Sequence, residues 1–263
     1  MTSGKRAGKP RTSIWLTGKP VPKRRSDAPG GGEGAALDLD RILSASVRLL
    51  DADGLAKFSM RRLAAELGVT AMSVYWYVDT KDDLLELVLD EVNGEMTLPD
   101  PADESADWRE QLRQLALGYR GLLLAHPWVS RLVGQYFNVG PRAMAFAEAT
   151  LAVMRRSGGE QETVLGGLSA LFEFVYGFAT IDAVYRDRCR EAGLSPDEYF
   201  RHVESALTSR EEFSEQYRQM SEVLDSRHTE SVEVLREREF ELGLETVLAG
   251  IEVMVGRDRA KTG

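Results

Sequence analysis

Apolar residues recur at intervals of three and four along most of this chain, which is the spacing of helices with one buried side. The earliest clear repeat spans residues 37–53 and is carried by Leu39, Ile42, Leu43, Ser46, Val47 and Leu50. Further helices are predicted at 81–96, 108–124, 127–137, 141–156, 160–191 and 236–255. We find no convincing strand and no internal repeat, so the pattern predicts an all-α fold.

Two short helices separated by a glycine stand between residues 59 and 78. Ser59 is a good N-cap for the first, Gly68 is the residue type that ends helices, and Thr70 can cap the second. Two helices joined by such a short turn are typical of a helix-turn-helix, whose second helix enters the DNA major groove. The sequence therefore predicts a DNA-reading unit here.

The inward and outward residues of this motif can be separated by position. Those expected to face inward and hold the two helices together are Leu63, Leu67, Val69 and Val74. Those left on the outward side are Thr70, Ala71, Met72, Ser73, Tyr75, Trp76 and Tyr77. Ala and Met can touch thymine methyl groups, Thr and Ser can bond to base edges, and Tyr and Trp can reach phosphate oxygens.

Two basic residues flank this surface. Arg61 lies in the first turn of the preceding helix, where its side chain can reach a guanine edge or a phosphate. Lys81 begins the next helix, where its ammonium group can pair with a backbone phosphate. A hairpin inside an ordinary helical bundle is the alternative to a DNA-reading motif. Consecutive helix positions point in different directions, however, so Tyr75, Trp76 and Tyr77 cannot all face one core.

Charge is distributed unevenly along a chain whose net charge is −9. Residues 1–36 hold eight basic residues against Asp27 and Glu33, a local charge of +6, so the remainder carries −15. This segment is rich in Gly and Pro and is expected to be disordered when alone, apart from the apolar island Ile14-Trp15-Leu16. Basic arms beside a helix-turn-helix can lie in the minor groove.

We therefore expect contacts to DNA from the arm residues Arg11, Lys23, Arg24 and Arg25. A solubilising tail with no role in DNA binding is the alternative.

Cys189 is the only cysteine, so disulfides within the chain are excluded and a reducing cytoplasm is the simplest compartment. No secretory signal is recognised near the start. The apolar stretch 164–181 carries Glu173 near its middle, which favours a buried or subunit-facing helix over a membrane span.

A Pro- and Asp-rich break at 97–106 divides the chain. We expect a basic arm at 1–36, a DNA-binding domain at 37–96, a second helical domain at 97–256 and a tail at 257–263.

Residues 37–96 resemble the DNA-binding domain of the TetR family of bacterial regulators. The matching segments are Ser59-Met-Arg-Arg-Leu-Ala64, Leu67-Gly-Val69, Ser73-Val-Tyr-Trp-Tyr-Val78 and Lys81-Asp-Asp-Leu-Leu85.

The resemblance continues more weakly through Trp108, Leu112, Arg113, Tyr119, Arg120 and His126 and returns at 240–245. It implies that the DNA-contact positions of the family are occupied by Ser59, Arg61, Thr70, Ala71, Met72, Ser73, Tyr75, Trp76, Tyr77 and Lys81. It also implies a homodimer formed through helices 160–191 and 236–255, which binds a palindromic operator. Burial of both helices within one subunit is the alternative.

By the same resemblance, the second domain is similar to the effector domain of the tetracycline repressor. The implied pocket lining is Tyr119, Trp128, Tyr136, Phe137, Leu168, Phe172, Glu173 and Tyr176, a largely aromatic set that suits an apolar or polycyclic effector. That branch uses histidines to fix the drug and its magnesium ion. Thr97 stands where one is expected and 131–141 contains none, so no magnesium–tetracycline site, metal or cofactor is predicted.

The leading interpretation is a ligand-responsive repressor, with activation left open. An enzyme is disfavoured because the chain has no Gly-rich phosphate loop, no Gly-x-Ser-x-Gly elbow and no His-x-x-x-His zinc pair. A pure protein-interaction module, docking through the charged stretch 196–235, is the third class considered.

Overall fold

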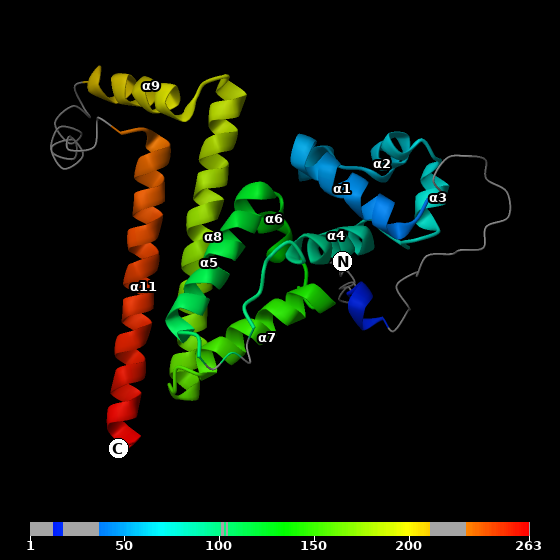
Figure 1. Cartoon of the computed structure of the whole chain (residues 1–263). Helices are drawn as coiled ribbons and strands as arrows, with labels where there is room; N and C mark the ends of the chain where they lie inside the picture. The colour runs from blue at the N-terminus through cyan, green and yellow to red at the C-terminus, as the bar shows by residue number, and fades with distance from the viewer. Residues whose placement is uncertain (1–12, 18–36, 101–102, 104, 211–229, 263) are drawn as a thin grey trace, which may run out of the picture. The chain divides into compact units, whose positions relative to one another are not determined.

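The computed structural model describes residues 13–17, 37–100, 103, 105–210 and 230–262 (Figure 1). Within these ranges the regular structure is entirely helical, which confirms the all-α prediction. The chain divides into two compact units. The first comprises Met1–Thr97 and Ala125–Glu148, and the second comprises Leu98–Leu124 and Ala149–Gly263.

The first unit is built around a bundle of short helices. The 3-10 helices η1 and η2 span Ile14–Leu16 and Leu55–Lys57. The α-helices of this unit are α1 (Leu39–Asp53), α2 (Met60–Leu67), α3 (Ala71–Tyr75), α4 (Lys81–Asn93) and α6 (Val129–Val133). Ile42, Leu63 and Leu84 are fully buried and belong to α1, α2 and α4, so the apolar repeats seen in the sequence form the core.

Asp90 ties α4 to the start of α7 (Pro141–Arg155) within the first unit. Its buried carboxylate accepts hydrogen bonds from the backbone N–H groups of Arg142 at 3.1 Å and Ala143 at 3.0 Å. These amides belong to the first turn of α7, where no helical carbonyl can accept from them. Burial raises the pKa of Asp90, while the backbone donors and the Arg142 guanidinium oppose this rise. A Cβ on Gly140 would lie 2.2 Å from the Asp90 carboxylate, so only glycine fits there.

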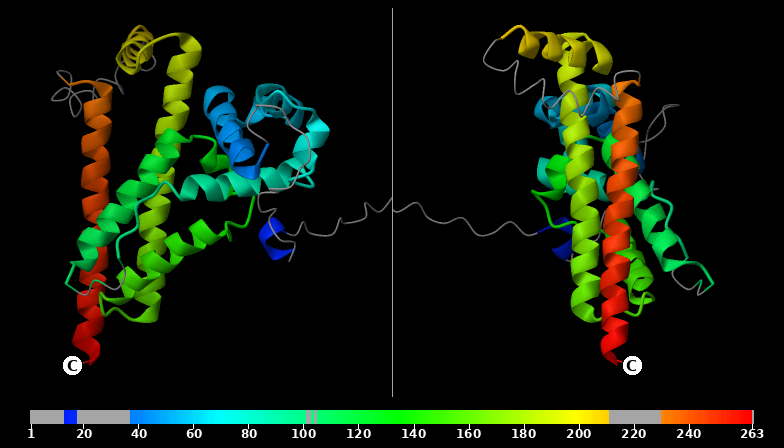
Figure 2. Two further views of the ribbon diagram at one scale, coloured as in Figure 1. Left: turned by 45° about the vertical axis from the view of Figure 1, so that its right-hand side comes forward. Right: turned by 90° about the vertical axis from the view of Figure 1, so that its left-hand side faces the viewer.

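The second unit consists of longer helices. They are α5 (Trp108–Ala125), the end of α7, α8 (Gln161–Ala192), α9 (Pro196–Thr208) and α11 (Val232–Thr262). Helices α8 and α11 lie side by side and run in opposite directions (Figure 2). The close approach requires Gly243 of α11, because a Cβ there would lie 2.5 Å from the ring of Phe174 on α8. Ser195 and Glu198 form a capping box at the start of α9.

An aromatic cluster fills the contact between α8 and α11. The fully buried ring of Phe240 lies 5.6 Å from that of Phe174 and 5.3 Å from that of Phe178, measured between ring centroids. The guanidinium carbon of Arg120 on α5 lies 4.0 Å from the Phe240 centroid, in the geometry of a cation–π contact. Arg120 also pairs with Glu237 at 2.7 Å, so its buried charge is compensated.

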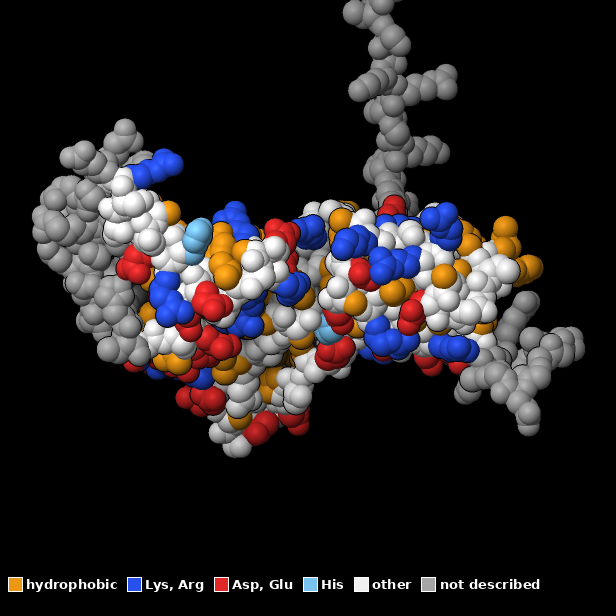
Figure 3. Space-filling model, turned by 90° about the horizontal axis from the view of Figure 1, so that it is seen from above, with side chains coloured by type: hydrophobic (Ala, Val, Ile, Leu, Met, Phe, Trp, Pro, Cys, Tyr) orange, Lys and Arg blue, Asp and Glu red, His pale blue; other side chains and the backbone are white. Residues whose placement is uncertain are grey.

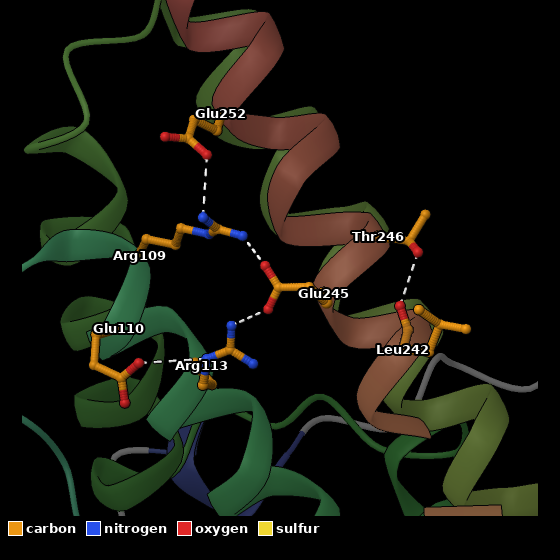
Figure 4. Close-up of polar contacts among 7 residues, drawn as sticks. All are labelled: Arg109, Glu110, Arg113, Leu242, Glu245, Thr246 and Glu252. Carbon is orange, nitrogen blue, oxygen red and sulfur yellow. Dashed lines mark hydrogen bonds and ion pairs between the residues drawn. The ribbon is translucent and has the colours of Figure 1, made fainter. Parts of the chain in front are cut away.

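A second set of charges joins α5 to α11 (Figure 4). The carboxylate of Glu245 accepts hydrogen bonds from the guanidinium groups of both Arg109 and Arg113. Arg109 also reaches Glu252 at 3.2 Å, and Arg113 reaches Glu110 at 3.3 Å. The five residues form one alternating network, which contributes more than the same number of isolated surface pairs.

Helix α8 is long and apolar enough to cross a membrane by length and composition alone. Its most apolar stretch has a mean hydropathy of 1.6, yet only 22% of that stretch is buried within this chain. Leu165, Ile181 and Val184 are exposed on α8, as are Leu242, Val253 and Met254 on α11. The two helices therefore combine a buried side with a second, exposed apolar side.

Candidate nucleic-acid interface

Local capping signals place the α2–α3 hairpin where the sequence predicted it. Ser59 Oγ accepts a hydrogen bond from the backbone N–H of Arg62, and Gly68 adopts the left-handed conformation with φ 69°. Thr70 caps α3 by accepting from the backbone N–H of Ser73 at 3.3 Å. Val74 is fully buried, so the short helix α3 is held by packing as well as by its cap.

The outward side of α3 and the residue after it expose large side chains. Met72 is 68% exposed, Tyr75 41% and Trp76 74%. Neighbouring exposed apolar side chains of this size are typical of surfaces that bind another molecule. Ala71 is half-buried beside them, and all four lie on one short hairpin. This arrangement matches the predicted reading surface and excludes the alternative in which the aromatic run is packed in a core.

Four polar residues of the predicted surface have partners within the first unit. The hydroxyl oxygens of Thr70 and Ser73 lie 2.9 Å apart. Tyr77 is half-buried, and its hydroxyl donates to the carbonyl oxygen of Leu37 at 2.5 Å. The ammonium group of Lys81 donates to the carbonyl oxygen of Phe58 at 2.7 Å. Tyr77 and Lys81 therefore stabilise the hairpin. Either side chain can contact DNA only through the hydrogen-bonding capacity that these bonds leave unused.

The two arginines of α2 differ in their surroundings. Arg62 pairs with Asp53 of α1 at 2.5 Å, which holds its guanidinium against the body of the unit. Arg61 is exposed and, among the residues that the structure describes, forms no ion pair. Its side chain is therefore not held by any described acidic residue, as the predicted DNA contact requires.

The apolar island of the N-terminal arm docks on the first unit. Ser13 is buried and its hydroxyl donates to the buried carboxylate of Glu86 on α4. Ile14 and Trp15 are half-buried in the same segment. The predicted DNA contacts Arg11, Lys23, Arg24 and Arg25 lie outside the described residues.

The net charge of the hairpin differs from that of the whole DNA-binding domain. Residues 37–97 carry six basic and twelve acidic side chains, whereas residues 59–78 carry two basic and one acidic. Figure 3 shows Lys and Arg side chains gathered over the helices of the first unit on the face that it displays. The local basic surface is thus modest, and the eight basic residues of the arm are the larger source of positive charge.

Comparisons with known proteins agree with this geometry. Residues 42–88 match the family model described as bacterial regulatory proteins of the tetR family, and residues 100–255 match the tetracyclin repressor-like C-terminal domain. The transcriptional repressor DrrR1 of Streptomyces coeruleorubidus is 30% identical over 254 residues, which cover 95% of this chain and 87% of the repressor. This chain belongs to the TetR family.

Other TetR-type relatives extend the comparison. A transcriptional regulator of Saccharopolyspora erythraea is 39% identical over 157 residues, and the match spans 60% of this chain and 65% of that regulator. Apo ActR from Streptomyces coelicolor superposes with a TM-score of 0.67 at 28% identity, covering 85% of this chain and 99% of ActR. ActR in complex with actinorhodin gives a TM-score of 0.66 at 30% identity, covering 84% and 100%.

Membership in the TetR family shows the general function of the chain. The chain is a ligand-responsive, DNA-binding transcriptional regulator, and it is not an enzyme. The interpretation of the α2–α3 hairpin as a helix-turn-helix is thereby confirmed. The individual contact residues remain predictions that rest on their exposure and position.

The eight residues predicted to line the effector pocket of this TetR-family chain fall into both units. The second unit contains Tyr119, Leu168, Phe172, Glu173 and Tyr176. Tyr119 packs edge-on against Phe172 with centroids 5.8 Å apart, and burial, with a smaller contribution from Tyr176, raises the pKa of Tyr119 to about 12. Glu173 is exposed, whereas Leu168 and Tyr176 are half-buried.

The other three predicted pocket residues belong to the first unit. Trp128 is buried and its indole N–H donates to Asp51 at 2.7 Å. The hydroxyl of Tyr136 donates to Asp82 at 3.0 Å, while Phe137 is 75% exposed. These polar bonds had no signal in the sequence, because they join residues more than fifty positions apart.

A buried histidine between two carboxylates in the first unit was not predicted from the sequence. The ring of His126 lies between two carboxylates, with Nδ1 2.8 Å from Asp51 and Nε2 2.9 Å from Glu95. The hydrogen bond to Asp51 raises the pKa of His126, burial opposes that rise, and Glu95 adds to it. Since both ring nitrogens face acceptors, the protonated imidazolium, which has two donors, fits the site best. No group of three or more His, Cys, Asp or Glu among the described residues is placed to hold a metal ion.

The raised pKa of His126 predicts a pH-dependent stability for the first unit. A group whose pKa is higher in the folded state contributes stability below its unfolded value of 6.5, and this is lost as pH rises through the folded pKa. We expect the free energy of unfolding to fall as pH rises above 6.5, and we expect His126→Gln to flatten that fall. Urea titrations at several pH values measure it, with the exposed His202→Gln as the control. An equally steep fall in His126→Gln would contradict the prediction.

Proposed function

We propose that this chain is a homodimeric, cytoplasmic repressor that binds a palindromic operator and is released by a small apolar or polycyclic effector. The observation that carries the proposal is the exposed surface of Met72, Tyr75 and Trp76 on a hairpin whose inner side is fully packed. A rigid scaffold under an exposed recognition helix is what base reading in the major groove requires. The repressor DrrR1 and the ActR–actinorhodin complex support repression and a polycyclic ligand by similarity.

Dimerisation is supported by the exposed apolar sides of α8 and α11. A helix with a mean hydropathy of 1.6 and only 22% of its apolar stretch buried leaves much apolar surface in water. Burying such surface against a second copy stabilises the assembly by about 25 cal/mol per Å². A two-fold dimer presents two recognition helices to half-sites one helical turn apart, about 34–36 Å.

The direct test uses the DNA that flanks the chain's own gene. Purified protein is titrated into labelled fragments in a gel-shift assay with excess unrelated DNA, and its mass is measured by sedimentation equilibrium. We expect one specific complex of two chains per symmetric site. A chain that stays monomeric at micromolar concentration, or that binds all fragments equally, would rule the proposal out.

The basic arm is expected to add sequence-independent contacts. Ser13 donates to Glu86, and the carbonyl oxygen of Leu37 accepts from Tyr77. The described residues on both sides of 18–36 therefore contact the DNA-binding unit. We propose that Arg11, Lys23, Arg24 and Arg25 contact phosphates or the minor groove. Each phosphate contact contributes about 0.9 to the slope of log K against log salt.

Replacing these four basic residues with glutamine should therefore lower that slope by up to about 3.6. Operator affinity measured by fluorescence anisotropy between 50 and 300 mM salt gives the slope. A variant with the same loss of charge in the second unit serves as the control, with glutamine at Arg155, Arg188, Arg210 and Arg257. Equal slopes in the two variants would leave the arm without this role.

A further inference from the structure

A cavity of about 710 Å³ lies in the second unit between the C-terminal part of α8, α9 and the start of α11. Figures 1 and 2 show α9 crossing at the end of α8 beside the first turns of α11. Apolar side chains line part of its wall, among them Ile181, Phe200, Val232 and Leu235. Its volume falls in the range of sites that take drug-sized molecules. None of the eight residues predicted to bind the effector lines it.

Acidic side chains outnumber basic ones in this cavity. Among the residues that the structure describes, the lining contains five carboxylates, Asp182, Asp197, Glu204, Glu230 and Glu239, and two guanidinium groups, Arg201 and Arg236. Arg236 is already held by Asp182 at 2.6 Å and by Glu239 at 3.1 Å. Arg238, which does not line the cavity, pairs with Glu230 at 2.5 Å. When Arg238 is included, the described residues hold two more carboxylates than guanidinium groups, which favours a positive charge in the cavity.

One oxygen of Glu230 lacks a hydrogen-bond donor. Its Oε1 accepts from Arg238, while its Oε2 is buried and has no hydrogen-bond partner among the described residues. A buried charged acceptor without a donor costs free energy, and a ligand that supplies a donor or a cation removes that cost. Asp182 is only 6% exposed and its charge is paired with Arg236, so Glu230 is the carboxylate of the lining that is able to accept a new donor.

Aromatic rings complete the lining. The hydroxyl of Tyr185 donates to the carbonyl oxygen of Pro196 at 2.9 Å, and its ring meets Tyr199 edge-on with centroids 5.6 Å apart. Burial raises the pKa of Tyr185 to about 12, with further contributions from Cys189, Tyr199 and Asp197, so the phenol stays neutral. Neutral aromatic faces attract organic cations through the ring quadrupole. The ring of Phe200 offers a second such surface.

We propose that this cavity binds an amphipathic organic cation, with its apolar body against Phe200 and Leu235 and its charge facing Glu230. This ligand class differs from the apolar effector proposed above, and the two sites share no residue. The inference goes beyond operator binding and holds whether or not the cation changes operator affinity.

Two ions of the same shape and opposite charge provide the test. Tetraphenylphosphonium and tetraphenylborate are titrated separately into the full chain by isothermal titration calorimetry. We expect the cation to bind at least tenfold more tightly than the anion, because the cavity carries an excess of carboxylates. Equal affinity for the two ions, or no binding of the cation, would overturn the proposal.

Substitutions assign the binding to this cavity. Glu230→Gln should weaken tetraphenylphosphonium binding about tenfold, and Phe200→Ala should weaken it about fivefold. The matched control is Glu241→Gln, which removes an exposed carboxylate of α11 that does not line the cavity. Circular dichroism confirms that each variant is folded. Cation binding that is unchanged in folded Glu230→Gln and Phe200→Ala would place the ligand elsewhere and refute the assignment.

Discussion

Replacing Phe240 with alanine is expected to lower the free energy of unfolding by about 3–5 kcal/mol. The side chain is fully buried in α11 and contacts two aromatic rings of α8, so its loss opens a cavity that neighbouring helices cannot fill without moving. The Arg120 guanidinium also loses the ring that it lies over. Both losses fall on the contact between α5, α8 and α11, which holds the second unit together.

Urea denaturation followed by far-ultraviolet circular dichroism measures this change. The protomer concentration is held fixed, because dimerisation would make the apparent stability depend on it. Phe200→Ala is the matched control, since it makes the same substitution at a side chain that is 39% exposed, and it should cost less than about 1 kcal/mol. A loss below about 1.5 kcal/mol for Phe240→Ala would mean that the cluster is not the centre of the unit.

Replacing Arg61 with alanine is expected to weaken specific operator binding about 5- to 150-fold. A good bidentate contact to a base is worth about 1–3 kcal/mol of discrimination. Arg61 is the exposed arginine of α2 that no described acidic residue holds. Its removal touches neither the core of the hairpin nor its caps, so binding should fall without a change in fold.

Arg62→Ala separates base reading from the loss of one positive charge. Arg62 neighbours Arg61 and carries the same charge, but its guanidinium is paired with Asp53. We expect its removal to weaken binding much less and by the same factor on specific and unrelated DNA. Fluorescence anisotropy with both DNAs gives the two ratios. Equal loss of specificity in the two variants would remove the special role assigned to Arg61.

The hairpin and most helices could be predicted because their signals are local. Ser59, Gly68 and Thr70 each act on backbone groups within a few residues, and each occupies the capping position that its type favours. The apolar repeat also placed α1 and α8 within about two residues of their observed ends. Helix geometry also required that at least one of the three consecutive aromatic residues be exposed, and Trp76 is the most exposed of them.

Contacts between residues far apart in sequence explain the features that local sequence patterns did not predict. The predicted helix 127–137 is shorter in the structure, where α6 ends at Val133 and Tyr136 turns to bond Asp82. Helix α11 begins at Val232 and continues to Thr262, beyond the predicted 236–255, because Arg, Glu and Lys favour helix even where apolar spacing stops. The cavity beside Glu230 could not be predicted, since it depends on how α8, α9 and the start of α11 pack against one another.

The bond between Asp90 and the first turn of α7 has a kinetic consequence. If α4 rotates or slides, either the start of α7 follows it or the amides of Arg142 and Ala143 lose their shared acceptor. Those two amides should then exchange with deuterium at the rate at which α4 departs from its resting position. Their protection against exchange would report how often α4 moves, in the absence of any ligand or DNA.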